Sequence, residues 1–149
     1  MQSYAAAAGA GAGGDIDTLL SKEKRNVSDD FYGAIRRALL QASESEREQV
    51  LNLARKLISE AGIVGMPETI DILRRVPAGK RERLVNAVKP VILPGDVNGH
   101  DISAIVYAFS KLEEGKWEET VTRIKQNFGN KKVNAGKVAG FLAEQGFEI

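Results

Sequence analysis

A pattern of twelve residues occurs twice in this chain, and it constrains the fold more than any other feature. Residues 47–58 read REQVLNLARKLI and residues 81–92 read RERLVNAVKPVI, so Arg, Glu, Asn and Ile recur at an offset of 34 residues. A fixed period in this range is typical of stacked helical hairpins, in which neighbouring units bury a continuous core. Proteins of this kind usually carry binding surfaces rather than reaction centres.

A third, weaker copy follows the first two. Residues 115–118 read GKWE and align with GKRE at 79–82, at an offset of 36 residues, so the third unit is two residues longer. We expect roughly two and a half to three units, which is close to the minimum for a stable array. The chain stops soon after the last expected helix, and we expect either a C-terminal cap or a fragment there.

Apolar residues with helical spacing mark every expected element, and no stretch alternates convincingly as a strand does. The sequence therefore predicts an all-α fold, a right-handed stack of helical hairpins. The residues expected to face inward are Phe31, Ile35, Ala38, Leu39, Val50, Leu53, Ala54, Leu57, Ile58, Ile70, Ile72, Leu73, Leu84, Val85, Val88, Val91, Ile92, Ile102, Ile105, Val106, Phe109, Trp117, Val121, Ile124, Phe128, Val138, Phe141 and Leu142.

Several helix ends can be placed from local signals. Ser45 and Glu48 have the spacing of a capping box, which predicts a helix start there. That helix should stop near Gly62, because glycine is common just after a helix end. Pro67 suits a first helical turn, where its missing N–H costs nothing. Pro90 falls inside an apolar stripe and should kink the helix or end it early.

The N-terminal part of the chain has a different composition. Residues 1–14 contain an Ala/Gly tract that would lose much backbone entropy on ordering, so we expect disorder. Residues 15–30 are polar and charged with one small apolar patch, which favours a tail or a weakly docked helix, and the mixed charges at 22–25 indicate a solvated segment. We therefore place a disordered tail at 1–27 and a single helical repeat domain at 28–149. The tail lacks the basic and apolar regions of a secretory signal.

The composition excludes several classes of function. Twenty-one basic and 20 acidic side chains give a formal charge of +1, which argues against a protein that mainly grips phosphate backbones. The chain has no cysteine and a single histidine, so disulfides, thiolate metal sites and multi-histidine sites within one chain are excluded. No apolar run approaches the roughly 20 residues that span a bilayer. We expect no membrane span and no cofactor.

The loop at 96–99 must be considered as a metal site. It opens like a calcium loop, but His100 and Asp101 fill the positions where an oxygen ligand and glycine are expected. The closing position falls near Tyr107, where no carboxylate is available. We therefore expect a plain turn at Gly95 and Gly99, with Asp101 capping the next helix.

Two features are candidate partner-binding sites. The basic residues Arg74, Arg75, Lys80, Arg81 and Arg83 could form a docking patch for an acidic partner or phosphate. The favoured interpretation is a solvated face whose charges pair with acids, of which the sequence offers Glu48, Glu82 and Asp71. Trp117 shares a helix face with Phe128, which favours core packing, but a tryptophan in a terminal repeat could also be an exposed anchor.

The segment 66–92 carries a resemblance to known repeats. It combines a Val-Pro-Ala turn at 76–78 with a following Arg-Glu helix. In this it resembles tandem helical repeats in large, poorly characterised proteins of intracellular bacteria, including chlamydia-like organisms. The resemblance implies an effector-like or scaffolding protein that is cytoplasmic or delivered to a host cell, and it carries no catalytic residue across.

A second, more distant resemblance is to the DNA-reading repeats of transcription-activator-like effectors. Pro67, the Gly-Lys turn at 79–80 and the Pro-Val-Ile run at 90–92 lie near positions that this family fills with similar residues. The base-reading pair would fall at about Val76 and Pro77, and neither side chain can hydrogen-bond a base edge. The third unit lacks both prolines.

We therefore expect a non-enzymatic protein-protein interaction module. With one histidine and no cysteine, the sequence shows no convincing Ser-His-acid or Cys-His set, and no glycine-rich loop has the surroundings of a phosphate site. The alternatives are nucleic-acid binding by degenerate DNA-reading-like repeats, or a self-assembling structural domain; the oligomeric state stays open. Under each of them Ala87 should face a neighbouring helix, so that an aspartate there should unfold the domain.

Overall fold

The computed structural model describes residues 16–147 and 149, and over these residues the chain is all-α. An isolated parallel bridge joins Ile92 to Val133. The α-helices are α2 (Ser21–Asn26), α3 (Asp29–Leu40), α4 (Arg47–Leu57), α5 (Met66–Arg75), α6 (Ala78–Val88), α7 (Gly99–Ser110), α8 (Trp117–Asn127) and α9 (Ala135–Glu144). Short 3-10 turns lie between them: η1 (Glu44–Glu46), η2 (Glu60–Gly65), η3 (Lys89–Val91) and η4 (Glu114–Lys116).

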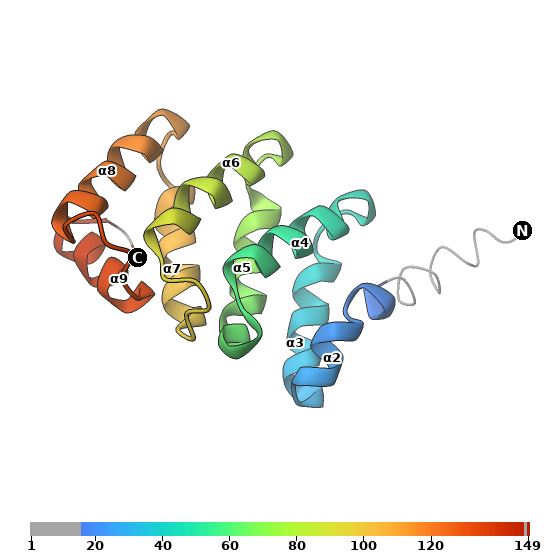
Figure 1. Cartoon of the computed structure of the whole chain (residues 1–149). Coiled ribbons are helices and arrows are strands. Elements are labelled where there is room, and N and C mark those ends of the chain that lie inside the picture. Colours follow the sequence, from blue (N-terminus) through green and yellow to red (C-terminus); the bar gives the residue numbers. More distant parts are fainter. Residues whose placement is uncertain (1–15, 148) are drawn as a thin grey trace, which may run out of the picture.

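The helices form two layers along one axis (Figure 1). In the first layer α3, α5, α7 and α9 pack side by side, and in the second layer α4 packs on α6 and α6 on α8. Successive helices pair across the layers, as α4 does with α5 and α6 with α7. The predicted stack of helices is therefore confirmed, with α9 as an additional first-layer helix.

The repeated Arg-Glu pattern marks one position in each second-layer helix. Arg47, Arg81 and Trp117 occupy this position, and each side chain donates hydrogen bonds to carbonyls at or just after the end of the preceding first-layer helix. The last carbonyls of a helix have no partner within the helix, so a donor from the next element stabilises that end. The bonds are Arg47 Nε to Ala42 O (3.1 Å), Arg47 Nη2 to Leu40 O (3.3 Å), Arg81 Nε to Leu73 O (2.7 Å), Arg81 Nη2 to Arg74 O (2.8 Å) and Trp117 Nε1 to Phe109 O (2.9 Å).

The start of α4 differs from the prediction. The helix begins at Arg47, and the Ser43 hydroxyl donates to Glu46 Oε2 at 2.5 Å in the turn before it. The capping box expected at Ser45 and Glu48 is therefore wrong by two residues. The segment carries Ser-x-x-Glu at both registers, so the local sequence offered two equivalent starts.

The other predicted helix ends are mostly confirmed. Pro67 lies in the first turn of α5, and α6 ends at Val88, directly before the turn that contains Pro90. The expected helix end near Gly62 is wrong, because α4 already ends at Leu57. Ile58 is extended, and η2 is a separate 3-10 turn that begins at Glu60. Most of the residues expected to face inward are buried; Phe31, Ala38, Leu57, Ile72, Val121, Phe128 and Phe141 are only partly buried.

The predicted domain boundary at residue 28 is wrong. Residues 16–19 and α2 are helical, and Ile16 and Leu20 are fully buried. Glu23, from the run expected to be solvated, is 2% exposed and binds Arg55 Nη2 at 2.6 Å. The partner lies 32 residues away on α4, which no local pattern reveals. Residues 1–15 of the predicted tail lie outside the described residues.

Candidate functional site

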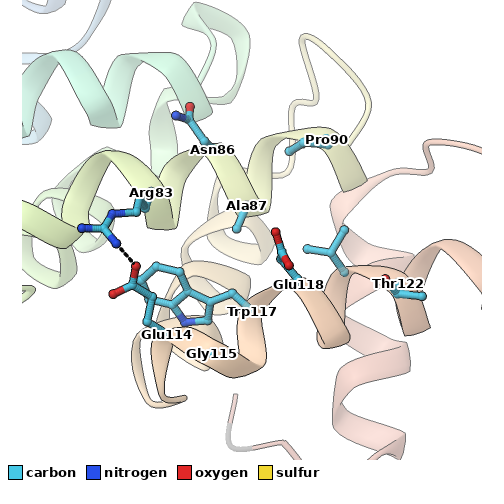
Figure 2. A pocket seen from close by; sticks show the side chains of 10 residues that line it. Arg83, Asn86, Ala87, Pro90, Glu114, Gly115, Trp117, Glu118 and Thr122 are labelled. Carbon is cyan, nitrogen blue, oxygen red and sulfur yellow. Dashed lines mark hydrogen bonds and ion pairs between the residues drawn. The ribbon is translucent and has the colours of Figure 1, made fainter.

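A groove of about 870 Å³ lies between α6 and α8 on the second layer, and we call it the α6–α8 groove (Figure 2). It combines apolar side chains with exposed polar groups from both helices and from η4. Its lining residues are Arg83, Asn86, Ala87, Pro90, Glu114, Gly115, Trp117, Glu118, Val121 and Thr122.

The repeat register explains why the groove is open. Leu53 on α4 and Ala87 on α6 are equivalent residues, 34 positions apart. Leu53 is 4% exposed and by its register faces α6, whereas Ala87 is half-buried and lines the groove toward α8. The valine of the facing helix differs in the same way. Val121 of α8 lines the groove and is half-buried, whereas its counterpart on α6, Val85, is fully buried. Alanine in place of leucine therefore leaves more open space at this position of the second interface.

The expectation for Ala87 needs correction. The residue does lie toward a neighbouring helix, but it borders open space rather than close-packed core. A side chain larger than alanine can therefore enter the groove without displacing core atoms. An aspartate at this position is no longer expected to unfold the domain.

The polar groups of the groove differ in their partners. Arg83 and Glu114 form an ion pair across one end, joining α6 to η4 (Figure 2). Glu118 forms no ion pair with any described residue. Asn86 and Thr122 are exposed, on α6 and α8 respectively. The groove therefore has one balanced pair of charges and one unbalanced carboxylate.

Trp117 forms part of the wall but is not an exposed anchor. The residue is 6% exposed, and its indole N–H donates to Phe109 O at 2.9 Å. Core packing, one of the two interpretations of this residue, is therefore confirmed. Phe128, expected on the same face, packs edge to face on Phe141 of α9 with ring centroids 6.0 Å apart.

A second, smaller hollow of about 320 Å³ shares Glu114 and Trp117 with the lining of the groove. We call it the side hollow. Its lining brings Arg75 and Lys80 together with the ends of α5 and α7 and with Val76 and Pro77. The remaining lining residues are Asp71, Ile72, Tyr107, Ser110, Lys111, Leu112, Glu113, Glu114 and Trp117.

The predicted basic cluster does not form one patch. Arg81 is 3% exposed and lies inside the stack, paired with Glu46. Arg74 and Arg75 both pair with Asp71, at 2.8 and 3.2 Å. Only Arg83 lines the α6–α8 groove, whereas Arg75 and Lys80 line the side hollow.

The acids that balance this cluster are only partly those expected. Asp71 was expected, but the other two partners are Glu46 and Glu114 in place of Glu48 and Glu82. Glu46, in the turn before α4, accepts from both Ser43 and Arg81, whereas Glu48 lies in the first turn of α4. The pairing with Glu114 reflects contact between neighbouring repeats, since Arg83 and Glu114 are 31 residues apart.

The loop at 96–99 serves to start the last helix. Asp96 accepts from the backbone N–H of Asn98 (2.8 Å) and of Ala135 (2.6 Å), the first residue of α9. The cap expected from Asp101 is wrong, because α7 already begins at Gly99. Within the described part of the chain, no three His, Asp or Glu side chains gather as a metal site requires.

Comparisons with protein-family models, with curated proteins and with solved structures give no match. None of the helices in the described residues is long and apolar enough to cross a membrane. The candidate site therefore rests on geometry. Sequence reasoning missed Ala87 and Glu118 as groove residues, although aligning Leu53 with Ala87 in the repeat would have indicated the opening.

Proposed function

We propose that this chain is a non-enzymatic protein-binding repeat domain in which the α6–α8 groove receives a segment of another protein. The observation that carries the proposal is the open space over Ala87, walled by Val121 and Trp117 and bordered by polar groups. An apolar centre with a polar rim is the usual anatomy of a protein interface. Its volume of about 870 Å³ is also within the range typical of binding pockets.

The chemistry of the groove favours binding over reaction. A covalent mechanism needs a nucleophile within hydrogen-bond reach of a base. Thr122 supplies the hydroxyl of the groove lining, and this hydroxyl forms no hydrogen bond with the carboxylate of Glu118. The groove lining contains no histidine, serine or lysine.

Nucleic-acid binding is the less favoured proposal. The cations expected to grip phosphates are mostly engaged by acids: Arg74 and Arg75 by Asp71, and Arg81 by Glu46. Binding to a phosphate backbone would require these pairs to open, against a net charge of only +1. The effector-like or scaffolding role implied by the resemblance stays a prediction.

The test is to fill the groove. Ala87→Leu restores the side chain of the first interface and should occupy the space between α6 and α8. Gln126→Leu adds the same side chain at an exposed position of α8 outside the groove and serves as the control. We expect short peptides selected from a random display library on the full chain to lose binding to Ala87→Leu and keep binding to Gln126→Leu.

Both variants should keep the circular dichroism spectrum and melting temperature of the parent. If no selected peptide is sensitive to Ala87→Leu while the fold is intact, the groove is not the binding site and the proposal fails.

A further inference from the structure

The two second-layer interfaces differ at several equivalent positions, and two of these differences bear on the recognition of a partner. Where the α4–α6 interface has Leu53 and Lys56, the α6–α8 groove has Ala87 and Pro90, at the same offset of 34 residues. The acid of the facing helix is the same in both, Glu82 on α6 and Glu118 on α8. The second interface therefore keeps the carboxylate but lacks the leucine and the lysine of the first.

The position of Glu118 makes this difference important. Its side chain points from α8 toward α6 at the level of Ala87 (Figure 2). The other charges of the groove, Arg83 and Glu114, neutralise one another. A partner that covered the groove would remove water from the Glu118 carboxylate, which is unfavourable unless the partner supplies a cation or other donors.

We propose that the occupant of the α6–α8 groove is a basic amphipathic protein segment. A bulky apolar side chain of the partner fills the space over Ala87, as Leu53 does at the first interface. A lysine or arginine about one helical turn away, in the relation of Lys56 to Leu53, pairs with Glu118. This inference rests on the proposed function and adds the chemistry of the partner.

The first experiment identifies the charge and the apolar residues of segments that bind the groove. A random peptide library is selected on the full chain and depleted on the Ala87→Leu variant, so that groove-dependent peptides are enriched. We expect enriched sequences to have a net positive charge and to place Leu, Ile, Met or Phe three or four residues from Lys or Arg.

The second experiment tests Glu118. A labelled peptide with the enriched motif is titrated by fluorescence anisotropy with the parent chain, with Glu118→Gln and with Glu82→Gln. Glu82 is the matched control, because it has the same place in the preceding helix and does not line the groove. Glu118→Gln should weaken binding about three- to tenfold. Glu82→Gln should leave the Kd unchanged. Added salt should reduce the difference in Kd between the parent and Glu118→Gln, because it screens the charge interaction.

The outcomes separate the two proposals. Groove-dependent peptides that are acidic or uncharged, or that bind equally to Glu118→Gln and the parent, would overturn the basic partner and leave the protein-binding function standing. Concentration-dependent self-association that Ala87→Leu abolishes would show that a second copy is the occupant and would also overturn it. If no peptide depends on the groove, both proposals fail.

Discussion

Replacing Arg81 with methionine is expected to lower the free energy of unfolding by about 3 kcal/mol. Methionine keeps much of the length of the side chain but donates no hydrogen bond. The guanidinium bonds Leu73 O, Arg74 O, Glu46 and Gln49, and its side chain is 4% exposed. Without the guanidinium, the carbonyls at the end of α5 lose these donors although they remain inside the stack.

The magnitude follows from these partners. A hydrogen bond from a charged donor contributes about 1.5–3 kcal/mol, and the two carbonyl bonds are the ones that water cannot easily replace. The Glu46 carboxylate is about one-third exposed and can be hydrated again, so its ion pair adds little. The desolvation cost of burying the guanidinium, which methionine does not have, offsets part of the loss.

Urea denaturation measures the effect. It can be followed by circular dichroism and by the fluorescence of Trp117, the single tryptophan of the chain, which lies in the next repeat. Arg83→Met is the control, because that arginine is 66% exposed and its ion pair with Glu114 should contribute less than about 1 kcal/mol. If the two variants unfold within about 0.5 kcal/mol of each other, the role given to Arg81 as a helix-end cap is refuted.

Three further predictions concern other contacts. Trp117→Phe should lower the free energy of unfolding by about 1–2 kcal/mol, because the ring stays buried but its hydrogen bond is lost. An unchanged midpoint of urea denaturation would contradict this. Glu23→Gln should weaken the bond to Arg55 and raise hydrogen exchange in α2 but not in α7; equal protection in variant and parent would refute the docking role. Burial, and then the bond to Asp17, raise the pKa of Tyr32 from 10.0 to about 12. The associated stability should be present below pH 10 and lost as the pH rises toward 12, and Tyr32→Phe should remove the corresponding step from the tyrosinate absorbance titration.

The repeat period was sufficient to predict the architecture. Helix faces are set by local spacing, so the two copies at 47–58 and 81–92 revealed hairpins without any knowledge of contacts. The exact first residue of a helix was harder to predict. The segment before Arg47, for example, carries two equivalent Ser-x-x-Glu registers. In the structure the Ser43–Glu46 register forms, and Arg47 directly after it bonds carbonyls at the end of α3, a contact that the local sequence does not reveal.

Contacts between distant segments could not be predicted. Glu23 looked like part of a solvated run until its partner Arg55, 32 residues on, was known. The ion pair of Arg83 with Glu114 likewise depends on how two repeats stack. Charged residues carry no local signal of their partner, so the basic cluster could not be divided into its buried and exposed members from sequence alone.

The groove is an intermediate case. The substitution of Ala87 for Leu53 is visible in the aligned repeats, but it signals an opening only once both residues are known to face the next helix. The same holds for Glu118, whose unbalanced charge depends on the pairing of Arg83 with Glu114.

The measurement that tests the central claim most directly is hydrogen–deuterium exchange of the full chain with and without a groove-selected peptide. Binding between α6 and α8 predicts added protection within residues 83–90 and 114–122, and no added protection in α3 or α5. Protection confined to the first-layer helices, or an unchanged pattern at saturating peptide, would contradict the claim that the opening at Ala87 is the binding site.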